Sequence, residues 1–244
     1  MPDDRRPKLR ADRRAIDFTQ KSLVIDGLSL YYVVDEPYTE QCLEAGVNAC
    51  NVSFALGDGW DAPLQNVEAG LTKIENSPLM MLVTSADDIQ KAKETGKLGV
   101  ILGTQGSSMI ETQLNRVGIM AKLGFRFFGL AYTSATLFAD GCGEKRNAGL
   151  SFLGMELIQA VNETPMILDL SHCGHRTRDE AIEQARAVVC THSNAWNLVN
   201  NDRNTKDSTA KAIIEKGGMV GVCGLPKTVN PKDPTVADLV GHVD

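Results

Sequence analysis

The sequence predicts one α/β barrel of the TIM type, a (β/α)8 fold, and two patterns support this prediction. Short apolar runs alternate with stretches of helical spacing along the whole chain, and no low-complexity segment interrupts them. Polar residues follow the C-terminal ends of several runs, where a parallel barrel collects its active-site loops. The apolar runs span residues 23–25, 49–55, 79–83, 98–102, 125–131, 166–170, 187–190 and 219–223.

The character of these runs favours parallel strands joined by helices. Each run is continuous and does not alternate with polar residues, as is typical of strands buried on both faces. Between two of them, Leu114, Val117 and Ala121 have the i, i+3, i+7 spacing of a helix face. Ser85, followed by two aspartates, indicates a helix start. Helix ends are predicted at the glycines that precede the next run, namely Gly96, Gly124 and Gly217.

A doubly wound open sheet is the competing architecture. It would typically carry a glycine-rich phosphate loop after an early strand, but the one candidate, Gly57-Asp-Gly59, is followed by Trp60 rather than by a third glycine. The barrel is favoured because polar residues follow five different runs and would converge on one mouth. These residues are Asp26, Gln105, Tyr132, His172 and His192.

Composition and charge exclude several classes of protein. The 244 residues are 43% hydrophobic and 23% charged, as in globular proteins, and the net charge of −6 predicts no nucleic-acid partner. Residues 1–14 hold six Lys or Arg against three Asp. We therefore interpret residues 1–18 as a basic arm, either a solvated leader or a subunit contact, and residues 19–244 as one incomplete barrel domain.

Neither a membrane span nor a secretion signal is visible in the sequence. No stretch approaches the ~20 apolar residues that a membrane helix needs, and the charged N-terminus lacks the apolar core of a signal peptide. The six cysteines are scattered without a Cys-x-x-Cys pair, which favours free thiols. The sequence thus predicts a cytoplasmic protein without a membrane partner.

Two histidines are the first candidates for chemistry. His172 and His192 each end a predicted buried strand and begin a loop, so that adjacent barrel strands would present both to the same mouth. Imidazole is a good ligand for a divalent metal, and two of them could hold one ion. The alternative is that each histidine is a hydrogen-bonded structural residue, and the sequence leaves both interpretations open.

Several segments together resemble the membrane dipeptidase family from about residue 20 to the C-terminus. The order and spacing of the histidine and arginine motifs carry most of this resemblance. The matching segments are Ile25-Asp-Gly27, Gly103-Thr-Gln-Gly106, the loop 140–150, Asp169-Leu-Ser-His172, Thr191-His-Ser-Asn194, Asp202-Arg-Asn204 and Gly217–Gly221.

The resemblance implies a zinc-dependent barrel that cleaves dipeptides with two metals, a bridging glutamate and a substrate-binding arginine. His172 and His192 match the histidines of the second metal, and Arg203 matches the arginine, whose planar guanidinium suits a carboxylate. Gln105 stands where the family has the bridging glutamate, and Tyr132 stands at the position of a substrate-binding histidine.

The first-metal ligands of the family are missing from this sequence. The His-x-Asp pair of the first strand is replaced by Leu28-Ser-Leu30, and neither leucine can ligate a metal. The family's proton-handling aspartate has no counterpart, because the segment 236–244 resembles the helix before the last strand. We therefore expect the last βα unit of the barrel to be missing. Three outcomes stay open: an unstable chain, completion by another copy as a homo-oligomer, or a longer parent.

The expected function is that of a dipeptidase-like metallohydrolase that acts on a dipeptide or a related small amide. We expect at most one zinc at His172 and His192, with a third ligand still required. Gln105 and Tyr132 would position the water or stabilise the oxyanion, and Asn194 would contact the substrate beside Arg203. The alternative is a catalytically impaired barrel that binds a small carboxylate ligand.

Overall fold

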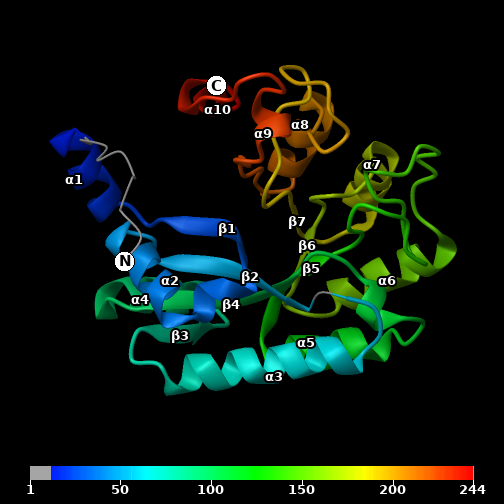
Figure 1. Ribbon diagram of the computed structural model, residues 1–244. Coiled ribbons are helices and arrows are strands. Elements are labelled where there is room, and N and C mark those ends of the chain that lie inside the picture. The colour runs from blue at the N-terminus through cyan, green and yellow to red at the C-terminus, as the bar shows by residue number, and fades with distance from the viewer. Residues whose placement is uncertain (1–11, 56, 244) are drawn as a thin grey trace.

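The computed structural model describes residues 12–55 and 57–243. Within these residues, seven parallel strands form one sheet in the order β1-β2-β4-β5-β6-β7, and β3 pairs with β4 alone. The sheet curls into an open half-barrel (Figure 1), which confirms the predicted fold class. The strands are β1 (Ile25–Leu30), β2 (Ala49–Ala55), β3 (Met80–Val83), β4 (Leu98–Thr104), β5 (Phe125–Gly129), β6 (Ile167–Asp169) and β7 (Val188–Val189).

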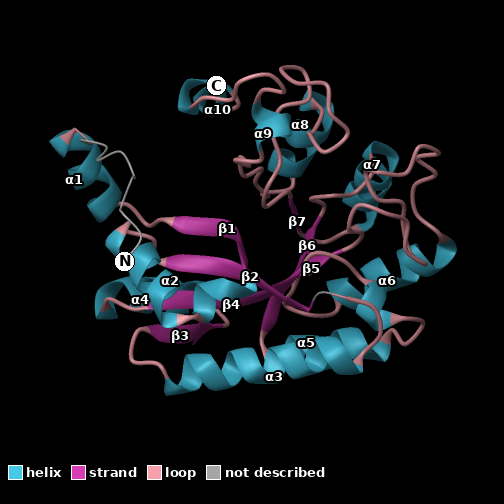
Figure 2. Ribbon diagram, viewed as in Figure 1, coloured by secondary structure: helices cyan, strands magenta, loops and turns pink. Residues whose placement is uncertain are grey.

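Helices cover the outer face of the sheet, as expected for crossover connections between parallel strands (Figure 2). Helix α3 contacts β2 and β3, α4 contacts β3 and β4, and α5 and α6 contact β5 and β6. Two 3₁₀ turns lie at Tyr31–Val34 and Ser108–Ile110. The helices are α1 (Arg13–Lys21), α2 (Glu36–Glu44), α3 (Asp61–Asn76), α4 (Ala86–Thr95), α5 (Asn115–Leu123), α6 (Phe152–Asn162), α7 (His175–Gln184), α8 (Asp207–Glu215), α9 (Pro226–Val229) and α10 (Val236–Gly241).

Local signals in the sequence place several of these helices correctly. Ser85 caps α4 and forms a reciprocal capping box with Asp88, so the predicted start is confirmed. Gly96 and Gly124 end α4 and α5 in the left-handed region, with φ of 67° and 105°, as their positions predict. These caps fix where each helix ends before the next strand begins.

The position of β3 differs from the order that the alternating pattern indicates. Strand β3 does not lie between β2 and β4, because β4 pairs directly with β2. On its other edge, the first residues of β4 pair with β3 and its later residues pair with β5. Gly99 of β4 makes this close packing possible, because a Cβ there would lie 2.7 Å from Cγ2 of Val83. The choice of which strand pairs with β4 leaves no periodic signal in the sequence.

The C-terminal strands are shorter than their apolar runs. The run 219–223 does not form an eighth strand; it makes a single parallel bridge from Val220 to Cys190. Two backbone hydrogen bonds hold the bridge, from Cys190 N to Met219 O (2.9 Å) and from Gly221 N to Cys190 O (2.8 Å). The wall of the barrel therefore stops at this segment.

The half-barrel has one open side, bounded by β1 and by the segment Met219–Cys223. Among the described residues, β1 pairs with β2 alone, so its outer edge has no strand partner. We call β1 and the segment Met219–Cys223 the two banks of this opening. Ile25 on one bank and Met219 on the other are 46% and 63% exposed. Between the banks lies a cavity of about 1040 Å³. Its apolar lining includes Ile101, Phe127, Ile167, Val189 and Val222.

The two banks of the open side meet at the mouth of the barrel. The carbonyl oxygen of Thr191 lies between Gly27 of β1 and Gly221, since a Cβ on either glycine would come within 2.5 Å or 2.3 Å of it. Only residues without a side chain permit this approach. The open side is thus closed at the mouth and wide towards the opposite end of the barrel.

The predicted basic arm lies largely outside the described residues. Of residues 1–18, the structure describes residues 12–18. Asp12 caps helix α1, which begins at Arg13 and ends at Lys21. None of the side chains of α1 is buried. In the described part of the chain, no helix combines the length and the apolar character needed to cross a bilayer.

Candidate active site

The mouth of the barrel brings together four of the polar residues that follow different strands. The Gln105 amide nitrogen lies 3.3 Å from Nε2 of His192, and the rings of His172 and His192 are 4.9 Å apart between centroids. Tyr132 stacks on His172 at 4.2 Å, and its side chain remains 49% exposed. The site therefore has a buried floor of imidazoles beneath an accessible phenol.

A chain of hydrogen bonds fixes the orientation of His192. The Thr191 hydroxyl donates to Asp169 Oδ2 (2.5 Å) and lies 2.8 Å from His192 Nδ1. Because the hydroxyl proton points to the carboxylate, Nδ1 of His192 must donate to Thr191, and Nε2 carries the lone pair. Gln105 then donates its amide N–H to Nε2. Asp169 thus orients His192 through Thr191.

His172 is held in an unusual backbone conformation. Its φ of 68° lies in the left-handed region, which non-glycine residues seldom adopt outside functional or strained sites. Its Nδ1 atom is buried and has no hydrogen-bond partner among the described residues. The loop from Asp140 supports it, since Cys142 N donates to the His172 carbonyl (2.6 Å).

Burial and positive charge keep both imidazoles neutral. Burial, with a further contribution from the Arg203 guanidinium, lowers the pKa of His172 to about 2. Burial likewise lowers the pKa of His192 to about 4, against the opposing effect of Asp169. At pH 7 both rings are therefore uncharged and able to offer a nitrogen lone pair to a ligand.

Two buried guanidinium groups make the site electropositive. Arg203 donates to the His192 carbonyl (3.2 Å) and forms no ion pair within the described residues. Fully buried Arg178 donates to the carbonyls of Leu170 (3.3 Å), Asn204 (2.6 Å) and Arg203 (3.2 Å). Arg178 therefore holds the loop that presents Arg203 to the mouth.

The first strand carries no metal ligand in the structure. Asp26 turns its carboxylate back on its own strand, where it accepts from Leu28 N (3.0 Å) and from the Ser29 hydroxyl. Leu28 lines the cavity of the open side. The aspartate predicted to face the mouth is thus engaged by the strand that carries it.

The described residues do not fit a zinc site. They contain no group of three or more His, Cys, Asp or Glu side chains that could hold a metal ion. His172 and His192 supply two imidazoles, whereas a catalytic zinc takes three protein ligands. Gln105 is neutral and donates to the one nitrogen of His192 that could ligate. Zinc at this pair stays a prediction.

Asn194 is occupied by the protein rather than free for a substrate. Its amide nitrogen donates to the Cys223 carbonyl (2.8 Å) and the Thr228 hydroxyl (3.0 Å), and its oxygen accepts from Cys223 N (2.9 Å). These bonds attach the segment after Val220 to the loop of His192. The geometry favours a structural role over the substrate contact that the sequence suggested.

Thr191 and Arg178 were not identified by the sequence. Thr191 directly precedes His192, and its position offers a weak signal, because a hydroxyl beside a histidine can orient it. Arg178 offers none, since its partners Arg203 and Asn204 lie 25 and 26 residues further along the chain. Such contacts follow from the fold alone.

The loop that supports His172 predicts a specific response to acid. Asp140 accepts hydrogen bonds from Arg146 (2.6 Å at the shortest) and from Ala148 N (2.8 Å), and chiefly Arg146 lowers the pKa of its carboxyl. A lowered pKa stabilises the fold above the unfolded value of about 3.9, and this stability is lost as pH falls through the folded value. Asp140→Asn should therefore reduce the urea midpoint at pH 7 but much less at about pH 3.

The matched control for this experiment is Asp58→Asn, which removes an exposed carboxylate elsewhere. Its urea midpoint should follow that of the unchanged protein at both pH values. Equal behaviour of the two variants at pH 7 would show that Asp140 contributes no stability to the loop.

Comparison with known proteins identifies close counterparts of this half-barrel. Residues 27–244 match the family model described as membrane dipeptidase, peptidase family M19. An uncharacterized dipeptidase of Schizosaccharomyces pombe is 31% identical over 187 residues, covering 71% of this chain and 45% of its own length. Dipeptidase 3 of Rattus norvegicus is 29% identical over 181 residues, covering 68% and 36%. The matches thus span less than half of these two relatives.

Solved structures show the same architecture. An amidohydrolase from Pseudomonas aeruginosa superposes with a TM-score of 0.88 at 31% identity, covering 93% of this chain and 70% of its own. A metallopeptidase from Rhodobacter sphaeroides, liganded with a phosphinate mimic of the dipeptide L-Ala-D-Ala, superposes with a TM-score of 0.75 at 19% identity, covering 91% and 81%. The second likeness supports the fold alone.

Proposed function

Because this chain belongs to the membrane dipeptidase family, we propose that its barrel mouth binds a dipeptide or a related small amide and hydrolyses it. The observation that carries the proposal is Arg203, a buried guanidinium without an ion-pair partner among the described residues. Leaving such a charge unpaired is costly, and a substrate carboxylate would pair with it bidentately. The neighbouring neutral imidazoles add no competing charge.

The other groups of the mouth suit the remainder of such a substrate. With its carboxylate on Arg203, the amide of the ligand would extend towards the exposed Tyr132 hydroxyl and the Gln105 side chain. Both can donate a hydrogen bond to a carbonyl oxygen on which negative charge develops. His172 and His192 would form the floor of the site. No step of this proposal passes through zinc, because the two histidines alone do not make a zinc site.

The lack of metal ligands at the mouth favours a second function, which is binding of a small carboxylate without efficient hydrolysis. Leu28, Leu30 and Gln105 stand at the positions where the family resemblance would require charged or imidazole ligands. A mouth with Arg203 and without these ligands would bind a small carboxylate and turn it over slowly or not at all. Hydrolysis and binding are therefore tested separately.

The experiment combines calorimetric binding with product detection. L-Ala-D-Ala, L-Ala-L-Ala and acetate serve as probes, each with and without added zinc. Release of alanine supports the hydrolase, and binding without release supports the carboxylate-binding function. No heat of binding with any probe contradicts both.

Arg203→Met should weaken binding of the dipeptides by about 10- to 100-fold, because a hydrogen bond to a charged group contributes about 1.5–3 kcal/mol. The control is Arg176→Met, on the exposed face of α7, where the guanidinium pairs with Glu180. Its affinity should equal that of the unchanged protein. Equal affinities for all three proteins would exclude Arg203 as the anchor.

A further inference from the structure

The buried groups of the mouth carry an excess of positive charge. Arg203 and Arg178 are both buried, and among the described residues each donates to carbonyl or hydroxyl oxygens rather than to a carboxylate. The buried carboxylate beside them is Asp169, which accepts hydrogen bonds from Ser171 and Thr191. Two guanidinium groups against one carboxylate leave one positive charge unbalanced.

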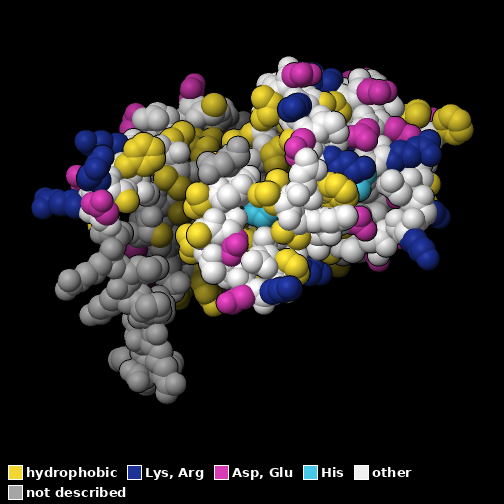
Figure 3. Space-filling view, turned by 90° about the horizontal axis from the view of Figure 1, so that it is seen from above, with side chains coloured by type: hydrophobic (Ala, Val, Ile, Leu, Met, Phe, Trp, Pro, Cys, Tyr) yellow, Lys and Arg dark blue, Asp and Glu magenta, His cyan; other side chains and the backbone are white. Residues whose placement is uncertain are grey.

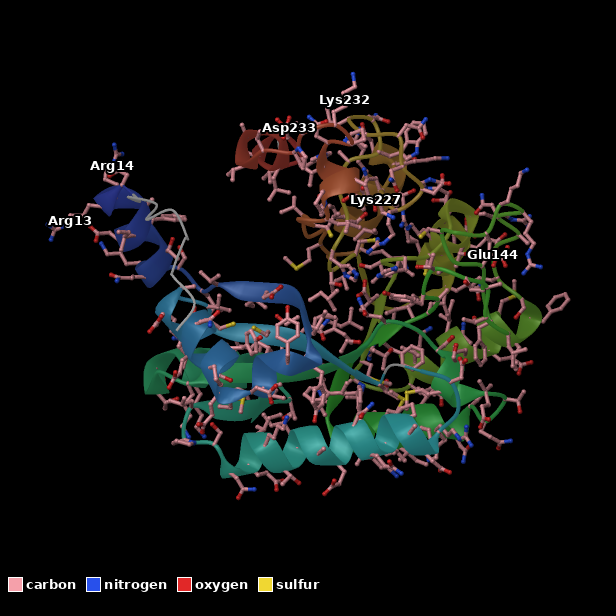
Figure 4. All side chains as sticks on the ribbon, viewed as in Figure 1. Arg13, Arg14, Glu144, Lys227, Lys232 and Asp233 are labelled. Carbon is pink, nitrogen blue, oxygen red and sulfur yellow. The ribbon has the colours of Figure 1, made fainter. Side chains whose placement is uncertain are left out.

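The other carboxylates of β1 and of the surrounding loops do not balance this charge. Asp140 is paired with an arginine of its own loop, and Asp26 accepts hydrogen bonds from its own strand. Glu144, labelled in Figure 4 on the loop that follows β5, accepts from a backbone amide of that loop (2.8 Å). The Asp202 side chain is 75% exposed. Each of these groups is thus engaged by its own segment or faces solvent.

The remaining polar groups of the mouth are neutral, and His172 reports the field that they experience. Besides burial, the charges of Arg203, His192 and Arg178 lower the pKa of His172, and each of these charges is positive. A proton on this imidazole is therefore disfavoured. An ammonium group brought to the same place by a ligand would experience the same repulsion.

We propose that the preferred substrate of this mouth is an amino acid whose nitrogen carries an uncharged acyl group, rather than a free dipeptide. This inference rests on the proposed function, since it takes from it the binding of the carboxylate by Arg203. An N-acyl amino acid has the same carboxylate and the same amide bond as a dipeptide, but it lacks the α-ammonium group. It brings one negative charge and no positive one, so it balances the mouth.

The position of the ammonium in a bound dipeptide makes the difference large. With the carboxylate on Arg203, the acyl half of the ligand lies beyond the amide, beside Gln105 and Tyr132. Gln105 carries no charge, and its amide N–H donates to His192, so it offers an ammonium no counter-ion. An uncharged acyl group would instead pack against the stacked rings of Tyr132 and His172.

Charges on the outer surface do not supply this selectivity. Basic and acidic side chains are intermingled on the face seen in Figure 3, so the exposed charge there has no single sign. Salt screens exposed charges over about 8 Å at physiological ionic strength, whereas buried charges are screened much less. The selectivity therefore depends on the buried groups of the mouth.

Two probes that differ in one group test the proposal, namely L-Ala-L-Ala and N-propionyl-L-alanine, which lacks only the α-amino group. Calorimetry at pH 6.5, with a chelator present, should show that the unchanged protein binds N-propionyl-L-alanine about 10-fold more tightly. Turnover is measured separately, with and without zinc. Addition of water across the acyl carbon–nitrogen bond releases propionate and alanine from this probe, and alanine alone from the dipeptide.

The pH dependence of the two affinities provides a readout that needs no variant. The α-amino group of the dipeptide loses its proton near pH 8, so the 10-fold preference should fall to about twofold at pH 9. Protein groups act on both probes and cancel in the ratio of the affinities. These groups are Cys142, Asp169, His172, His192, Arg178, Arg203 and Tyr132.

A variant with a carboxylate in the mouth provides a third readout. Gln105→Glu, with the chelator present, should lose the preference for N-propionyl-L-alanine, because the new negative charge would pair with the ammonium of the dipeptide. The matched control is Gln113→Glu, which adds the same charge at an exposed position and should keep the preference.

The outcomes separate this proposal from the function on which it rests. Equal affinities for the two probes, or tighter binding of the dipeptide, would overturn the proposal and leave the proposed function standing. Binding of neither probe would overturn both. A preference that persists unchanged at pH 9 or in Gln105→Glu would also overturn the proposal, because it would not arise from the ammonium group.

Discussion

Replacing Arg178 by leucine should lower the free energy of unfolding by about 3 kcal/mol, because buried carbonyl groups would lose their donor. The guanidinium is fully buried and donates to the carbonyls of Leu170, Arg203 and Asn204. The Asn204 carbonyl has no other hydrogen-bond donor among the described residues, and leucine offers it none. The urea midpoint, followed by circular dichroism, measures the loss.

Arg176→Leu is the matched control, because it makes the same change one half-turn away on α7. The exposed Arg176 side chain pairs with Glu180, so the variant should lower the free energy of unfolding by no more than about 0.5 kcal/mol. If the two variants unfolded at the same urea concentration, the carbonyl cluster around Arg178 would not be a stabilising feature. Arg178→Leu should also weaken ligand binding, since the loop of Arg203 loses its support.

Replacing Gln105 by glutamate should increase the affinity for zinc by about 100-fold, or about 2.7 kcal/mol. The side chain already lies 3.3 Å from the Nε2 atom of His192, whose lone pair points towards it. A carboxylate has no N–H to donate to Nε2, so both groups would direct lone pairs at an ion between them, and the carboxylate would be a third ligand beside His172 and His192. Its negative charge would also offset one of the two buried guanidinium groups.

Competition with a chromophoric chelator measures the zinc affinity directly, without reference to catalysis. The control is Gln113→Glu, which adds the same charge at an exposed position after the Ser108–Ile110 turn. Zinc binding by Gln105→Glu that does not exceed binding by this control would show that the two histidines are not placed to share an ion. Such a result would favour the carboxylate-binding function.

The fold was predictable to the extent that it depends on local patterns. Continuous apolar runs indicate buried parallel strands, and caps such as Ser85 and Gly96 mark helix ends, because each depends on neighbours in the sequence. The place of β3 was not predictable, because the order of strands in a sheet depends on packing such as the close approach of Val83 to Gly99, which periodicity does not reveal. The same applies to the run 219–223, which is apolar enough for a strand but makes one bridge.

For the site, the sequence indicated which residues would meet but not how they would be held. Gln105, Tyr132, His172 and His192 follow separate strands, and a parallel barrel brings strand ends together. Their roles stay predictions. The support from Thr191 and Arg178 could not be predicted, because these contacts depend on loop conformations, including the left-handed backbone of His172.

The contact of Gly27 and Gly221 with one carbonyl oxygen makes the width of the barrel at its mouth depend on the backbone alone. Both banks pack against the same backbone atom of Thr191, so a side chain on either glycine would push them apart at the mouth. The spacing at that point is set by backbone contact and cannot shrink further. The hydroxyl of the same Thr191 donates to Asp169 and accepts from His192, so the residue that sets the spacing of the two banks also orients the histidine. A single residue thus couples the closure of the barrel wall at the mouth to the tautomer of the histidine beside it.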